Sequence, residues 1–116
     1  MATNYIGAGT FTANTVITQS LGVVLSTNGG VGLSTSTACD GFAIIDAASG
    51  DNVSVAFLTN NGTLKGTLAA APVTAGDTLY LASSGQISTT GTVTIGKSKT
   101  TTSTTGAVVE FLPKNI

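Results

Sequence analysis

The side chains that could carry chemistry are few in this chain of 116 residues. It has five carboxylates, four lysines and one cysteine, and it has no histidine or arginine. Acid-base catalysis needs two titratable groups in different environments, and a serine or cysteine nucleophile needs a neighbouring base, most often histidine. Asp51 follows Gly50 and Asp77 follows Gly76, so hydrogen bonding within turns accounts for both carboxylates. We predict that the chain is not an enzyme.

Two stretches come close to known ligand-binding patterns. Residues 46–51 contain two aspartates and Ser49, but without the spacing of a calcium-binding loop. Residues 91–98 fit the phosphate-loop pattern of Gly, four residues and Gly-Lys-Ser. The four residues between the glycines, Thr92–Ile95, are all β-branched and typical of a strand, whereas a phosphate loop must open a helix. We therefore predict no bound metal, nucleotide or other cofactor.

Charge and targeting signals exclude further classes of protein. Only 8% of the residues are charged and the net charge is -1, so no basic field is available for nucleic acid or anionic lipid. The first residues lack the basic and apolar regions of a secretory signal, and no apolar run reaches the length of about 20 residues that spans a bilayer. Cys39 has no partner for an intramolecular disulfide and is interpreted as a buried or loop thiol. We predict no nucleic-acid, membrane or small-molecule partner.

The composition favours an all-β fold. Threonine makes up about a fifth of the chain and, with Val and Ile, gives the β-branched enrichment of pleated strands. Fifteen glycines punctuate these strands. Low charge and positive mean hydropathy leave little repulsion between copies, which favours a subunit of an assembly. The alternative is a neutral soluble domain that its threonine hydroxyls keep hydrated.

Turn signals define the order of the expected strands. Residues 1–9 are predicted to form an extended N-terminal arm and residues 10–116 a single body. The clearest hairpin joins Gly22–Ser26 to Val31–Ser34 through Asn28-Gly29, since Asn-Gly accepts the positive φ angles of tight turns. Other expected strands are 10–20, Phe42–Asp46, Val53–Phe57, Thr63–Leu68, Thr78–Leu81, Thr92–Ile95 and Ala107–Leu112.

These segments give seven to nine short strands and the pattern of a small β-barrel or tulip-like sandwich. The residues expected to be buried in the segment 10–21 are Phe11, Val16, Ile17 and Leu21. Gly50 is expected to be left-handed, and Val53, Val55 and Phe57 to share one face. A single helical turn is predicted at Ala69–Pro72. No internal repeat of fixed period is visible in the sequence.

From Gly41 onward the order of motifs is particular. An Ala-Ala-Ser-Gly-Asp turn at Ala47–Asp51 is followed by Val53-Ser-Val, by Ala-Gly-Asp-Thr-Leu-Tyr at Ala75–Tyr80, and by Gly-Ala-Val-Val-Glu at 106–110. This order resembles the capsid cement, or head decoration, proteins of tailed bacteriophages. The resemblance covers about two thirds of the chain, roughly Gly41 to Leu112.

The resemblance implies a structural virion protein rather than an enzyme. Such a protein is made in the host cytoplasm, binds the outer surface of the assembled phage head as a homotrimer, and stabilises the capsid. Its partner is the major capsid protein, and the N-terminal arm commonly adds a strand to that partner. Here the arm residues are Thr3, Asn4, Tyr5 and Ile6. Strand addition relies on backbone hydrogen bonds and makes little demand on side chains.

A second hypothesis is a carbohydrate- or receptor-binding β-module of a phage tail or surface structure. Sugar sites usually present an aromatic platform with polar neighbours. Tyr80 and the four phenylalanines are expected mostly at core positions, which favours the first hypothesis.

Overall fold

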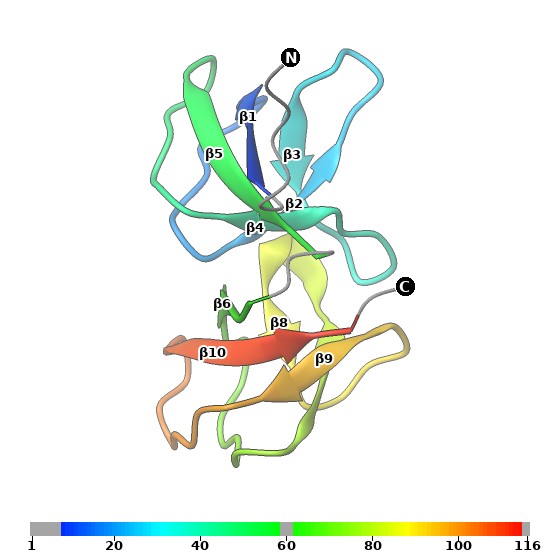
Figure 1. The fold of residues 1–116 in the computed structure, drawn as a ribbon, viewed down its shortest axis with the longest axis vertical. Coiled ribbons are helices and arrows are strands. Elements are labelled where there is room, and N and C mark those ends of the chain that lie inside the picture. The colour runs from blue at the N-terminus through cyan, green and yellow to red at the C-terminus, as the bar shows by residue number, and fades with distance from the viewer. Residues whose placement is uncertain (1–7, 59–61, 115–116) are drawn as a thin grey trace.

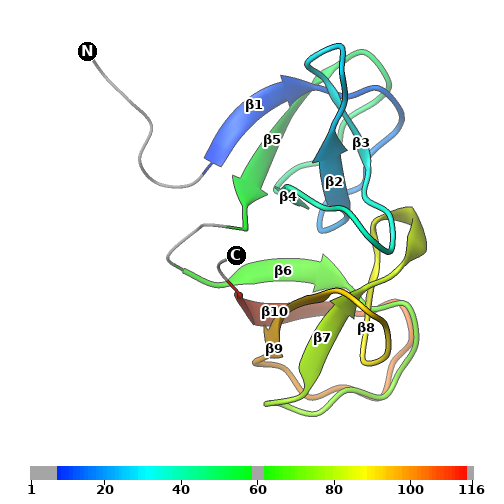
Figure 2. The same cartoon turned by 90° about the vertical axis from the view of Figure 1, so that its right-hand side faces the viewer.

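A computed structural model describes residues 8–58 and 62–114 of the chain. The described residues form two five-stranded antiparallel sheets and one short 3-10 helix, η1. The strands are β1 (Ala8–Thr12), β2 (Gly22–Leu25), β3 (Val31–Leu33), β4 (Gly41–Ala43), β5 (Asn52–Phe57), β6 (Leu64–Thr67), β7 (Thr78–Leu81), β8 (Ile87–Ser88), β9 (Thr94–Ser98) and β10 (Val108–Pro113), and η1 is Ser83–Gly85. The first sheet lies above the second in Figure 1, and the turned view in Figure 2 gives the same separation.

The first sheet, in the order β1-β5-β4-β2-β3, is built around the predicted hairpin. Val23 pairs with Leu33 and Leu25 pairs with Val31, and the Ser26 amide donates to the Gly30 carbonyl (2.8 Å) to close the turn. Gly29 takes a φ of 87°, as the Asn-Gly sequence predicts. The sheet curls until Ala13, just after β1, bridges Val31 of β3, but it does not close into a barrel.

The second sheet repeats the topology of the first. Its order, β6-β10-β9-β7-β8, is the order of the first sheet with each strand replaced by its counterpart in the second half of the chain. The isolated β-bridges recur as well. The bridges Ala13–Val31 and Ile17–Ala47 of the first half have equivalents about 55 residues further along, Leu68–Ile87 and Val73–Thr102. The chain therefore consists of two structural repeats, although no repeat of fixed period is visible in its sequence.

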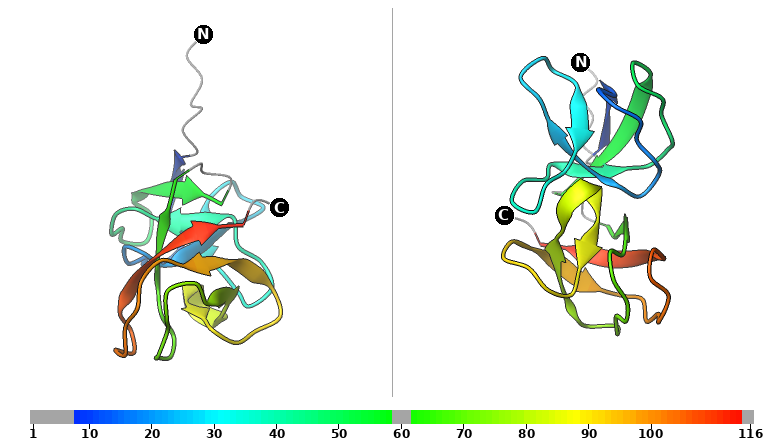
Figure 3. Two further views of the ribbon diagram at one scale, coloured as in Figure 1. Left: turned by 60° about the horizontal axis from the view of Figure 1, so that its bottom comes forward. Right: turned by 180° about the vertical axis from the view of Figure 1, so that it is seen from behind.

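The two sheets pack face to back, as a sandwich. Alternation along β4 and β5 directs Phe42 and Ala56 to the opposite side of the first sheet from Val53 and Val55. Phe42 meets Phe111 of the second sheet edge to face, with ring centroids 5.3 Å apart. Phe42, Ala56 and Leu58 thus belong to the core of the second half, whereas Val53 and Val55 belong to the core of the first. The view from behind in Figure 3 shows the same two layers.

The all-β prediction is confirmed, in the form of a sandwich with ten strands rather than seven to nine. Gly50 is left-handed (φ 90°) and Val53 and Val55 are buried, with Phe57 half-buried on the same face. The helical turn at Ala69–Pro72 is wrong, since these residues form a bend before Val73 bridges Thr102.

Two further predictions fail where a strand ends early. Val16 is exposed and only Ile17 is buried, because the chain after β1 touches the core through single bridges rather than through a strand. Likewise β4 ends at Ala43, and Ile44 and Ile45 are exposed. Ala47 is buried instead, in the bridge to Ile17.

Candidate interaction surfaces

Three of the five carboxylates accept hydrogen bonds from backbone amides. Asp40 accepts a hydrogen bond from the Leu25 amide (2.7 Å), and Asp46 accepts one from the Gln19 amide (2.7 Å). Asp77 accepts from the Thr74 amide (2.9 Å), in the turn that its sequence predicted. Within residues 8–58 and 62–114, no three His, Cys, Asp or Glu side chains gather as metal ligands would. Among the same residues, no helix is long and apolar enough to cross a membrane.

The phosphate-loop pattern at residues 91–98 falls on strand β9. Lys97 pairs with Leu112 of β10, so the Gly-Lys-Ser segment is held in a sheet and opens no helix. A Cβ at Gly96 would overlap the carbonyl oxygen of Leu112, which explains the glycine by close backbone approach. These residues do not form a phosphate cradle.

Cys39 is a half-buried thiol between β3 and β4. Its S–H donates to the Gly41 carbonyl (3.3 Å), and burial raises its pKa to about 11. The thiolate is the reactive form, so the folded protein holds this cysteine in an inert state at neutral pH.

We expect iodoacetamide to alkylate Cys39 at pH 8 about 100-fold more slowly in the folded protein than in denaturant, since the pKa rises from 9.0 to about 11. The folded rate should keep rising above pH 9, where the rate for the unfolded chain levels off. Mass spectrometry of quenched samples measures both rates. Equal rates, or a plateau near pH 9 in the folded protein, would contradict the expected pKa shift.

An open apolar groove of about 600 Å³ crosses the first sheet. Its side of the sheet, named here the groove face, carries Leu25, Val55 and Phe57, with Phe11 edge-on to Phe57 at 5.8 Å between ring centroids. Asp40 also lines the groove, next to the exposed Leu25. Two of the four phenylalanines therefore lie half-buried at a surface rather than in the core, where sequence reasoning had placed most of them.

The outward side of the second sheet, named here the lysine face, has a different character. Pairing of Glu110 with Lys65 and of Leu112 with Lys97 places these four side chains on one side of the sheet. Leu112 is 57% exposed, and a shallow hollow of about 380 Å³ runs beside it. All four lysines of the chain belong to the second half.

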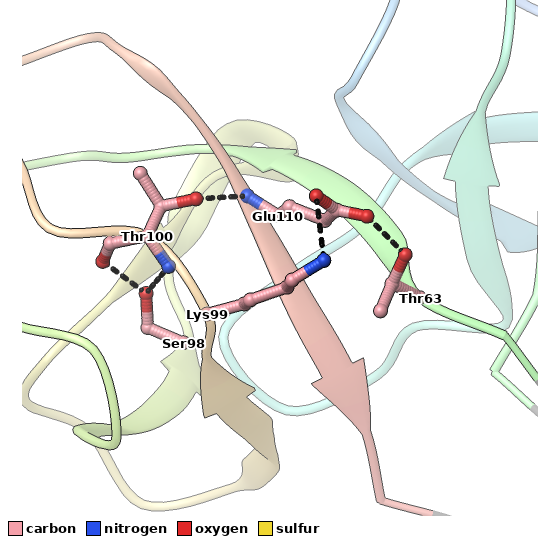
Figure 4. A network of polar contacts seen from close by, with 5 residues as sticks. All are labelled: Thr63, Ser98, Lys99, Thr100 and Glu110. Atoms are coloured by element: carbon pink, nitrogen blue, oxygen red, sulfur yellow. Dashed lines mark hydrogen bonds and ion pairs between the residues drawn. The ribbon is translucent and has the colours of Figure 1, made fainter.

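A polar network anchors Glu110 on this face (Figure 4). Thr63 donates a hydrogen bond to its carboxylate, and the Lys99 ammonium lies 3.7 Å from the other oxygen. Both contacts favour the ionised form and lower the pKa of Glu110. The Glu110 amide donates to the Thr100 hydroxyl (3.0 Å), which fixes the chain beyond β9 against β10. The face carries Lys65 and Lys97 against Glu110 and is net positive, and neither of these two lysines forms an ion pair within the described residues.

The predicted capsid-binding residues Thr3, Asn4, Tyr5 and Ile6 lie outside the described residues. The chain is described from Ala8, which starts β1 at the edge of the first sheet. Ala8 and Gly9, predicted as the end of the arm, instead pair with Ala56 and Val55 of β5.

Comparison with solved structures finds this architecture elsewhere. The chain superposes on the crystal structure of the head fiber gp8.5 N base of bacteriophage phi29, with a TM-score of 0.75 over 92% of each chain. The fold is that of a phage head-fiber base. At 16% identity the likeness establishes the fold, and it agrees with the resemblance to phage head proteins found in the sequence. No protein-family model and no curated protein matches the chain.

Sequence reasoning missed both surfaces for a common reason. The groove face depends on which side of the first sheet stays uncovered, and the lysine face depends on strand register across β6, β10 and β9. The sequence does contain one signal of a charge difference between the two halves. All four lysines follow residue 62, and three of the five acidic residues precede it.

Proposed function

We propose that this chain is a non-enzymatic structural protein of a phage virion, bound as a homotrimer to the outer surface of the head. The observation that carries the proposal is the match over 92% of both chains to the fold of a phage head-fiber base. The scattered carboxylates and the inert thiol are in keeping with a protein that binds rather than catalyses.

In this proposal the major capsid protein is the partner, and residues Thr3–Ile6 add a strand to it. The position of β1 supports this role, because β1 lies at the edge of the first sheet and Thr3–Ile6 shortly precede it in the sequence. Three copies bridging several capsid subunits would convert weak single contacts into tight retention. Binding to the assembled shell alone then stabilises it by mass action. Synthesis in the host cytoplasm fits a chain whose one cysteine forms no disulfide within the chain.

We expect that deletion of residues 1–7 abolishes binding to purified heads that lack this protein and leaves the thermal unfolding of the protein unchanged. The deletion stops before Ala8 because Ala8 and Gly9 belong to β1. Binding is measured by cosedimentation, and unfolding by circular dichroism.

A variant with residues 1–7 replaced by a Gly/Ser segment of equal length separates the arm's sequence from its length. An exposed-loop variant, Val16→Asp, is the matched control and should bind as the parent does. If the deletion variant cosedimented with heads to the same extent as the parent protein, the proposed role of the arm would be contradicted. Failure of the parent protein to bind heads would contradict the proposed function itself.

A further inference from the structure

Each half of the chain has one surface in the contact between the halves. By the internal repeat, the other half carries an equivalent surface that nothing in the described part of the chain covers. Inside the chain, Phe42 and Ala56 on the reverse side of the first sheet cover the face of the second sheet that carries Phe111. By the internal repeat, Phe111 corresponds to Val55 on the groove face. The pair Phe42 and Ala56 of β4 and β5 corresponds to the pair Lys97 and Leu112 of β9 and β10. The groove face is therefore equivalent to the surface of the second sheet that the first half covers, and the lysine face is equivalent to the surface of the first half that covers it. Neither face is covered by another part of the described chain.

The exposed fractions of equivalent residues in the two halves show which side chains a second molecule would cover on these two faces. Leu81 pairs with Ile87 in the second sheet and is 3% exposed, whereas its counterpart Leu25 pairs with Val31 in the first sheet and is 53% exposed. On the other surface, Ala56 is 8% exposed and its counterpart Leu112 is 57% exposed. Each open surface thus presents a leucine where the internal contact buries its equivalent.

Charge is complementary between the same two surfaces. The first half of the described chain holds Asp40, Asp46 and Asp51 and no lysine, and the second half holds all four lysines against Asp77 and Glu110. Asp40 lines the groove, and Lys97 stands where the internal contact has Phe42. A lysine stem can lie on apolar surface while its ammonium reaches a carboxylate at the rim. Val55 and Asp40 line the same groove, so Lys97 laid over Val55 as Phe42 lies over Phe111 would have a carboxylate in that groove as its partner.

We propose that the groove face of one copy binds the lysine face of a second copy, in the arrangement by which the first half of each chain covers the second. Leu112 fills the groove beside Leu25, and Lys97 pairs with Asp40. The contact is heterologous, so copies joined by it either close a ring or extend a filament. It does not depend on the proposed virion role, since it forms in solution without heads.

The test is the molar mass of the full chain, measured by sedimentation velocity across a concentration series. We expect the parent protein to sediment as a multiple of 11.4 kDa. Leu25→Asp and Lys97→Asp should each weaken association by at least tenfold. Asp40→Asn should also weaken it, and it keeps an acceptor for the Leu25 amide. Circular dichroism confirms that each variant is folded.

Charge exchange makes the test specific to the pair. Asp40→Lys alone should dissociate the oligomer, and the double variant Asp40→Lys with Lys97→Asp should restore it. Asp51→Lys changes the net charge equally outside the groove and should leave the mass unchanged. A parent protein that stays monomeric at every concentration overturns the proposal. An oligomer that persists in all the groove-face and lysine-face variants also overturns the proposal. If only deletion of residues 1–7 dissociated that oligomer, the contact would belong to the arm.

Discussion

Leu79→Asp is expected to leave the protein without a cooperative unfolding transition at 25 °C. Leu79 is fully buried in β7, in the core that both halves share. An ionised carboxylate there would lose its hydration without gaining a partner, and a protonated one would still leave a cavity and an unpaired polar group. The sum is comparable to the whole stability of a domain, about 5–15 kcal/mol. A flat circular dichroism melt, together with lost chemical-shift dispersion in NMR, is the measurement.

The control for this experiment is Val108→Asp. Val108 is an exposed apolar residue on the second sheet, in β10, so the same substitution there should cost only about 0.5–1 kcal/mol of strand propensity. If Leu79→Asp melted like Val108→Asp, the assignment of Leu79 to the inward side of β7 would be wrong.

Phe42→Ala is expected to destabilise the protein by about 3–5 kcal/mol, since it removes a buried ring and leaves a cavity between the sheets. Its effect reaches beyond one sheet, because Phe42 contributes to the core of the second half through Phe111. Urea denaturation monitored by circular dichroism measures the loss. Phe111→Ala and the double variant complete a cycle in which the two losses should not add, because the rings touch.

The comparison variant for this cycle is Phe11→Ala. Phe11 is only half-buried, on the groove face, and its ring contacts Phe57 rather than the second sheet. Its loss should be clearly smaller than that of Phe42. A Phe42→Ala variant as stable as Phe11→Ala would show that the halves are held together elsewhere.

Local patterns in the sequence predicted the parts of the fold that depend on local physics. Alternation placed Val53 and Val55 correctly, because a half-buried strand forces every second residue inward. The turn at Gly29 was correct because few residues other than glycine accept its positive φ angle. The failures at Ile44 and Ile45 have the opposite origin, since the end of β4 is decided by the neighbouring chain at Ala47 and Ile17 rather than by local hydrophobicity.

The internal repeat was hidden for a related reason. The two halves share a pattern of burial and turns rather than residues: Ile17 and Val23 correspond to Val73 and Leu79, and Gly50 corresponds to Gly106. Many apolar residues satisfy each buried position, so the letters diverge while the topology is kept. The groove and lysine faces were out of reach for the same reason, because they are defined by the relation between the halves.

The order of strands within each sheet has a consequence for how the protein folds. Each sheet pairs its first strand with its last, as in the pairing of Thr12 with Asn52 and of Thr67 with Val108, so each requires closure of a loop of about 40 residues. Such non-local pairing places folding in the slower range, of milliseconds to seconds. The first sheet draws all its strands from residues before 58. It can therefore assemble on the ribosome before the second half has been synthesised, with Phe42 exposed until its partner ring arrives.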